Sequence, residues 1–434
     1  MESSTTATTS WSLSRTIIFR FFFLFFGLLI FPFPIDVFTS LPAISTFTDA
    51  IIEIYTWLIN IVGTYILGID HELKMSENGS GDTLFDWMLY FTIILVSIIG
   101  TIVWSVLDRN RKSYNNLNNW FILYLSYYLV FVMLLYGLIK IFYLQFVPPN
   151  LERLYQTLGQ ISPMRLMWTF MGFSAPYTIF SGICETLAGI FLMFRRTRTL
   201  GGLLVFGVML NVFMLNMSYD IPVKLFSFQL LLAGLFIIFQ DYERIINFFI
   251  LNKTAAPSAQ TSVVHTKRGK LILVVSQLIF VGVVVFMQIQ GNLDRMKQFG
   301  IYREKSPLYG VYDVQKFVIN NDTLTTNYTD SIGWKRLLID YPNFLSIIKM
   351  NDKVKRYNTE LDTLKKQYTF SSRQDTVNKY LVNYNKVDDG LILDGIIEGD
   401  TLYVELQSYD LENFGLLNRG FNWINEVPYN RYNN

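Results

Sequence analysis

The stretch "WTFMGFSAPYTIFSGICETLAGIFLMF", residues 168–194, is long and apolar and contains one charged residue, Glu185. A helix needs about 20 residues to cross a hydrocarbon core of about 30 Å. Runs of this kind recur along the chain, so we predict a mainly α fold with a polytopic bundle of transmembrane helices. The seven predicted spans are 16–33, 85–107, 119–146, 167–194, 199–217, 223–240 and 270–290.

The composition agrees with a membrane protein. The 434 residues are 51% hydrophobic and only 16% charged. A net charge of +2 indicates no nucleic-acid partner. The single cysteine, Cys184, and the two histidines, His71 and His265, are too few for a thiolate zinc site, an iron–sulfur cluster or a bis-histidine haem. We therefore expect no bound metal and no metal-held or covalent cofactor, whereas a quinone remains compatible.

Basic loops predict the orientation, because such loops stay in the cytoplasm. The residues concerned are Arg15, Arg109, Arg111, Lys112, Arg195, Arg196, Arg198, Lys267, Arg268 and Lys270. All of these residues lie on the cytoplasmic side of the membrane only if the amphipathic helix predicted at 49–69 does not cross. That helix would instead lie in the membrane interface or re-enter on the outer side. The N-terminus is then cytoplasmic, and the tail after the last span is on the outer side.

The tail, residues 291–434, has strand-like alternation. In "GLILDGIIEGDTLYVELQSY" (390–409), Leu402, Val404 and Leu406 would face a core. We predict a β-rich soluble domain here, preceded by a flexible linker at 252–266 with no sign of function. The predicted domains are 1–115 (anchor span, interfacial helix and second span), 116–250 (four-helix core), 251–290 (linker and last span) and 291–434.

Glu185 is the candidate catalytic residue. Ser174, Tyr177 or Thr178, Ser181 and Glu185 recur at spacings of three and four, which places them on one helix stripe. A lone ionised carboxylate in hydrocarbon is costly, so the side chain either pairs or takes up a proton. It then either carries protons or donates a hydrogen bond that locks two helices together.

Lys140, in "YGLIKIFYLQF" (136–146), either pairs with Glu185 or extends to the headgroups. Its predicted depth, nearer the surface than Glu185, counts against the pair. Gly182 and Gly189 would let a neighbouring helix approach closely.

A polar pocket at the outer face is predicted from "NVFMLNMSYDIPVKLFS" (211–227). In the structural alternative, Asp220 caps the next helix, Pro222 lies in its first turn and Lys224 extends to the headgroups. The candidate ligand-binding residues are Lys140, Tyr177, Ser181, Asn211, Asn216, Asp220 and Lys224.

The closing "RGFNWINEVPYNR" (419–431) contains the candidate interaction residues Arg419, Trp423, Glu426 and Arg431. It either folds back as a final strand and turn or forms an exposed patch for a partner, since Trp, Tyr and Arg dominate such contacts.

Several motifs resemble the DoxX-like membrane proteins, in a long Bacteroidetes-type form with an extra soluble domain. They are "NGSGDT" (78–83), "YGLIKIFYLQF" (136–146), "SPMRLMWTFMGFSAPYTIFSGICE" (162–185), "RRTRTLGGL" (195–203), "NVFMLNMSYDIPVK" (211–224) and "RGFNWINEVPYNR" (419–431). Glu185, Asp220 and Lys224 fall on the family pattern, whereas "LYLSYY" around Ser126 stands where an arginine is common. The resemblance implies a bacterial inner-membrane protein with a four-helix core at 119–240 and a quinone-linked redox role. With the orientation predicted from the basic loops, the C-terminal domain is then periplasmic.

Three functions are compatible with these features. The first is a non-catalytic or co-catalytic oxidoreductase subunit whose helical core binds a quinone or lipid. The second is a membrane-anchored scaffold that recruits redox or other periplasmic proteins. The third is a proton-coupled carrier of a small solute, with Glu185 as the protonation site and Asp220 and Lys224 at the entrance.

Overall fold

The computed structural model describes residues 10–258, 260–324, 331–372 and 378–428. The chain divides into two compact units. The helical unit comprises residues 1–145 and 176–293, and the barrel unit comprises residues 146–175 and 294–434. The loop 146–175 therefore groups with the tail rather than with the predicted four-helix core.

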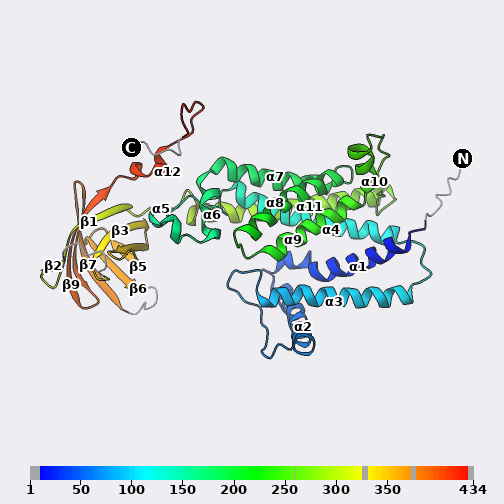
Figure 1. Cartoon of the computed structure of the whole chain (residues 1–434), viewed down its shortest axis with the longest axis horizontal. Helices are drawn as coiled ribbons and strands as arrows, with labels where there is room; N and C mark the ends of the chain where they lie inside the picture. The colour runs from blue at the N-terminus through cyan, green and yellow to red at the C-terminus, as the bar shows by residue number, and fades with distance from the viewer. Residues whose placement is uncertain (1–9, 259, 325–330, 373–377, 429–434) are drawn as a thin grey trace. The chain divides into compact units, whose positions relative to one another are not determined.

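Apolar helices make up the helical unit (Figure 1). They are α1 (Leu13–Ile30), η1 (Ile35–Phe38), α2 (Pro42–Leu67), α3 (Leu84–Leu107), α4 (Asn115–Ile141), α7 (Ala175–Met193), α8 (Arg198–Ser218), α9 (Lys224–Phe239), α10 (Tyr242–Ile245), η3 (Ile246–Ile250) and α11 (Lys267–Gln298). Within the described residues, seven helices are long and apolar enough to cross a membrane: α1 with η1, α2, α3, α4, α7, α8 and α11. The predicted class, a multi-pass helical membrane protein, is confirmed.

Two predicted spans differ from the observed helices. The span 167–194 is broken at Ser174, between α6 (Pro163–Phe173) and α7. Pro176 explains the break, because proline suits the first turn of a helix but disrupts a helix interior. The span 223–240 is α9, which has only 16 residues. It is long enough to cross a membrane only together with α10 and η3, which follow after a bend of 79°.

Helix α2 is long and apolar enough to cross a membrane, yet it packs against the end of α1 and the start of α3. The Tyr55 hydroxyl donates to the carbonyl oxygen of Leu28, near the end of α1, over 2.6 Å. Ile59 packs with Phe85 and Met88, at the start of α3. Figure 1 shows α2 end-on beside α1 and α3. That the helix around 49–69 does not cross the membrane stays a prediction.

The basic loops lie at one end of the helical unit. The amide of Trp11, before α1, donates to the carbonyl oxygen of Lys112, before α4, over 2.9 Å. The Arg195 guanidinium, after α7, donates to the carbonyl oxygen of Gln260 over 3.1 Å. The linker 252–266, predicted to be flexible, is attached to the helices at Ser258, whose hydroxyl donates to Asp241 over 2.7 Å.

The tail folds as an antiparallel barrel, so the prediction of a β-rich domain is confirmed. Among the described residues nine strands pair in one sheet; β1 pairs with β9 to close eight of them, and the two-residue β2 extends β1. The strands are β1 (Gly310–Ile319), β2 (Asp322–Thr323), β3 (Trp334–Tyr341), β4 (Phe344–Lys349), β5 (Val354–Asp362), β6 (Gln367–Ser372), β7 (Lys379–Val387), β8 (Gly390–Ile397) and β9 (Asp400–Tyr409).

Large side chains fill the barrel. Tyr368, Phe370 and Leu337 are fully buried, and Leu402, Val404 and Leu406 face the core. An eight-stranded barrel is just wide enough for its side chains to fill it.

The loop 146–175 packs on the outside of the barrel. It contains α5 (Leu151–Tyr155), η2 (Leu158–Gln160) and α6; η4 (Leu411–Asn413) and α12 (Gly415–Asn418) follow β9. Leu151 is buried against Val311, Leu338 and Ile348, whose side chains point away from the barrel core. Barrel and loop therefore share one apolar interface.

Candidate functional site

Lys140 and Glu185 form a buried ion pair. The Lys140 ammonium donates to both carboxylate oxygens of Glu185, each over 2.6 Å. The Lys140 side chain is 7% exposed and the Glu185 side chain 2%. The predicted pairing is confirmed.

Two glycines bring these side chains together. A Cβ on Gly182 would lie 2.6 Å from the carbonyl oxygen of Gly137 and 2.8 Å from the Cβ of Lys140. The backbones of α4 and α7 therefore touch, as the prediction for Gly182 required. Lys140 and Glu185 each follow their glycine by three residues, almost one helical turn, so both lie at the same level of the crossing. The predicted difference in depth is wrong for this reason.

The pair is arranged to join helices. Each Glu185 oxygen already accepts from the ammonium, and α4 and α7 close around the pair. One cavity lies beside α2 and another lies between α1 and the end of α9. Neither is lined by Lys140 or Glu185. A proton-carrying role for Glu185 stays a prediction.

The other predicted residues of this stripe do not converge. Thr178 is fully buried, whereas Tyr177 is 45% exposed, so Thr178 shares the inner face with Glu185. The Ser181 hydroxyl donates to the carbonyl oxygen of Thr178 over 2.8 Å. Asn211 is exposed on α8.

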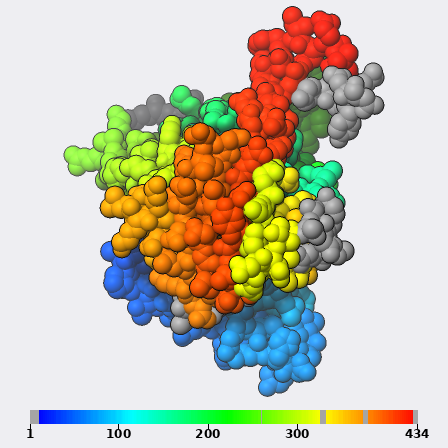
Figure 2. Space-filling model, turned by 90° about the vertical axis from the view of Figure 1, so that its left-hand side faces the viewer, coloured from blue at the N-terminus to red at the C-terminus, as the bar shows by residue number. Residues whose placement is uncertain are grey.

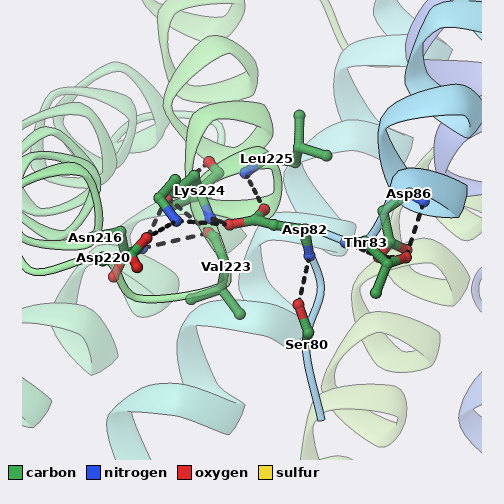
Figure 3. A network of polar contacts seen from close by, with 10 residues as sticks. Ser80, Asp82, Thr83, Asp86, Asn216, Asp220, Val223, Lys224 and Leu225 are labelled. Atoms are coloured by element: carbon green, nitrogen blue, oxygen red, sulfur yellow. Dashed lines mark hydrogen bonds and ion pairs between the residues drawn. The ribbon is translucent and has the colours of Figure 1, made fainter. Parts of the chain in front are cut away.

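Asp82 caps the start of α9, as Figure 3 shows. The amides of Lys224 and Leu225 donate to its two carboxylate oxygens over 2.8 and 3.0 Å. The amide of Gly81 donates to the carbonyl oxygen of Pro222 over 2.8 Å. A carboxylate is favourable at this position because the first amides of a helix lack partners within it.

The predicted outer pocket is a set of contacts among its own members (Figure 3). The Lys224 ammonium donates to Asp220 over 2.9 Å, and the Asp220 side chain is 87% exposed. The Asn216 amide is buried and donates to the Ser227 hydroxyl over 2.9 Å. The alternative role of Asp220 as a cap is wrong, because α9 begins after Pro222 and Asp82 takes its first amides.

Sequence reasoning missed Asp82 and Arg20. The Arg20 guanidinium, in α1, is buried and donates to the Tyr114 hydroxyl over 2.7 Å and to the Ser105 hydroxyl over 2.9 Å. The signal was present for Arg20, because it is a lone cation in an apolar run. Asp82 gave no local signal, because the helix that it caps is far along the chain.

The last described segment, residues 419–428, is largely exposed. Phe421, Trp423 and Ile424 are 78%, 90% and 78% exposed. No strand is assigned among residues 410–428, so the interpretation that this segment folds back as a strand is wrong there. Figures 1 and 2 show the segment projecting from the barrel after α12.

The predicted interaction residues lie partly in this segment. Glu426 is exposed, and the Arg419 guanidinium donates to Asn425. Arg431 lies outside the described residues. Across the described ranges no group of three or more His, Cys, Asp or Glu side chains is placed to hold a metal.

Comparison with known proteins gives one relative of interest. No family model and no solved structure matches the chain. Over 124 residues, 28% of its length, the chain is 31% identical to the "Uncharacterized protein YwoB" of Bacillus subtilis (strain 168), and the match covers 77% of that protein.

Proposed function

The chain belongs to the family of the uncharacterized YwoB protein of Bacillus subtilis, and from its own structure we propose that it is a membrane-anchored interaction protein. Its helices hold it in the bilayer. Its barrel unit recruits a protein partner through the segment 419–428, which we name the recruitment segment. The observation that carries the proposal is the exposure of Phe421, Trp423 and Ile424.

Exposed side chains of this kind are unusual on a soluble domain. Three large apolar residues lie exposed within four positions, and the rings of Phe421 and Trp423 are 5.0 Å apart. Exposed apolar patches mark interaction sites. Trp423 is the residue type most typical of binding hot spots. Inside the barrel, by contrast, large aromatic residues such as Tyr368 and Phe370 are fully buried. The recruitment segment therefore fits a partner with an apolar groove.

The filled barrel supports a role on its outer surface. Side chains such as Tyr368 and Leu337 occupy the interior, so the outer surface of the barrel is the part that it presents to a partner. The barrel then acts as a rigid support for the recruitment segment.

Polar contacts fasten the loop 146–175 to the barrel. The Glu152 carboxylate accepts from the Ser346 hydroxyl and the Arg356 guanidinium, each over 2.9 Å. The amide of Leu151 donates to Asp340 over 3.1 Å. The ends of this loop continue into α4 and α7, which the Lys140–Glu185 pair joins. The barrel unit is thus connected to the membrane helices by more than its one link to α11.

We infer a bacterial inner membrane with the barrel unit in the periplasm. The gathering of Lys112, Arg195 and the linker at one end of the helical unit supports a cytoplasmic assignment of that end. Helix α11 begins after this linker and runs to the barrel unit. Protease protection of residues 291–434 in sealed inside-out vesicles tests the orientation.

Site-specific photo-crosslinking in intact membranes tests recruitment. A photoreactive residue at position 423 should give a protein adduct of higher mass, and Phe421→Ala together with Ile424→Ala should abolish it. Leu364 is the matched control, because it is an isolated apolar side chain, 95% exposed, on the same unit. Equal adducts at 364 and 423, or adducts with lipid alone, would refute the proposal.

The DoxX-like resemblance, the quinone-linked redox role and the proton-coupled carrier stay predictions. For the redox role, the decisive measurement is quinone-dependent activity in membranes that contain Glu185→Gln. For the carrier, it is solute uptake driven by a pH gradient in proteoliposomes.

A further inference from the structure

A cavity of about 900 Å³ lies in the helical unit, and neither the Lys140–Glu185 pair nor Asp82 lines it. Its walls come from α1, from Asn118 of α4, from the end of α9 with α10, and from Ala256 and Pro257 of the linker. Ligand sites in proteins typically have volumes of about 300–1,000 Å³. The cavity is therefore large enough for a headgroup and the first part of its chains.

The lining of the cavity changes from apolar to polar along the helices. Its inner part is apolar and is formed by Ile18, Phe22, Leu232, Leu235 and Phe236, which lie away from the start of α1 and the end of α9. Toward those two helix ends, the mouth is polar, with Ser12, Arg15, Gln240, Arg244 and Asn247. An amphiphile fits this gradient, with its headgroup at the mouth and its chains alongside the phenylalanines. A bilayer supplies amphiphiles at high concentration.

Two opposite charges at the mouth lack an ionic partner within the described part of the chain. The Arg15 guanidinium lies over the Trp11 ring, 4.4 Å from its centre. Among the described residues, the one side chain that donates a hydrogen bond to Glu243 is Tyr242, through its hydroxyl over 3.0 Å. By contrast, Arg244 is paired with Asp241 over 3.2 Å. The mouth thus offers one cation and one anion that are free to bind a ligand.

We propose that this cavity binds a zwitterionic phospholipid of the phosphoethanolamine class. Arg15 binds the phosphate, Glu243 binds the ammonium group, and the acyl chains lie along Phe22 and Leu232. A purely anionic headgroup would leave its charge facing Glu243. A neutral headgroup would leave both side chains unpaired.

The mouth is already formed by contacts within the protein. Helix α9 bends by 79° into the α10–η3 segment, and Asp241 stands at the bend. The buried Asp241 carboxylate accepts from the Ser258 hydroxyl over 2.7 and 3.0 Å and from Arg244. These bonds fix the linker beside the cavity, so binding requires little reorganisation.

Lipid titration of the delipidated full-length protein in detergent, followed by native mass spectrometry, tests the proposal. Phosphatidylethanolamine and phosphatidylglycerol with identical acyl chains are the two probes. The wild type should bind phosphatidylethanolamine more tightly. Arg15→Gln should weaken the binding of both lipids by about fivefold, the value of one exposed ion pair. Glu243→Gln should weaken only phosphatidylethanolamine and so remove the preference.

Arg109→Gln is the matched control, because Arg109 is exposed in a basic loop and does not line the cavity. It should leave both affinities unchanged. Arg15 and Glu243 are also exposed, so their variants should fold, and an unchanged unfolding midpoint verifies this. The proposal is overturned if the wild type binds phosphatidylglycerol as tightly, if Arg109→Gln has the effect of Arg15→Gln, or if a quinone displaces both lipids.

Discussion

Replacing Glu185 by glutamine should strongly destabilise the helical unit. The variant leaves the Lys140 ammonium buried, at 7% exposure, without a counter-charge. The attraction lost at 2.6 Å is about 6 kcal/mol at an effective dielectric constant of about 20, and it mainly offsets desolvation in the wild type. Breaking a buried pair on one side typically costs about 3–5 kcal/mol, and we expect a value in this range.

The double variant Lys140→Met with Glu185→Leu separates the pair from other effects. Replacing both partners by apolar side chains of similar size removes the buried charges together, so stability should return to within about 1 kcal/mol of the wild type. The single variants Lys140→Met and Glu185→Leu form a thermodynamic cycle with this double variant. Its coupling energy should therefore be several kcal/mol.

Reversible unfolding in mixed detergent micelles, followed by tryptophan fluorescence and circular dichroism, measures these differences. Asp220→Asn is the control, because the Asp220 side chain is 87% exposed and the loss of its pairing with Lys224 should cost at most about 1 kcal/mol. If Glu185→Gln changes stability no more than Asp220→Asn, or if the single effects simply add in the double variant, the reasoning about a buried interhelical pair is wrong.

Three further predictions concern other contacts. Gly182→Ala should destabilise the helical unit in the same unfolding assay, because its Cβ would lie 2.6 Å from a carbonyl oxygen of α4, whereas Gly207→Ala, with no atom within 4 Å, should be neutral or stabilising. Asp82→Ala should cost about 0.5–2 kcal/mol, as for loss of a helix cap, measured as faster hydrogen exchange at the start of α9. Burial raises the pKa of Glu152, but hydrogen bonds from Arg356 and a serine outweigh it, so the pKa lies below its ordinary value. The stability from this contact is therefore present above about pH 4.5 and is lost as the pH falls through the lowered pKa. Exchange at α5 should accelerate on acidification in the wild type, but less in Glu152→Gln.

Local patterns predicted much of the architecture. Apolar runs located α1, α3, α4, α8 and α11, because crossing a membrane requires a minimum apolar length. Alternation located the core residues Leu402, Val404 and Leu406, because successive strand side chains point to opposite faces. Pro176 was an available signal for the break between α6 and α7, but the apolar run around it obscured the break.

Contacts between distant segments were not predictable in the same way. Asp82 caps a helix that begins 142 residues later, and no spacing rule connects them. Leu151 lies in a loop between two membrane helices and packs against the outside of the barrel. The pairing of Lys140 with Glu185 could be guessed from charge, but its geometry depended on the contact between Gly137 and Gly182.

By itself, the sequence determined which segments are apolar helices, that the tail is built of strands, and that a buried carboxylate needs a partner, because these follow from local hydropathy, periodicity and the cost of burying charge. Only the tertiary structure decided that Lys140 is that partner, that the strands close into a filled barrel, and that Arg15 and Glu243 lie at the mouth of one cavity. These depend on how helices and strands distant in the chain pack together, which no local pattern specifies.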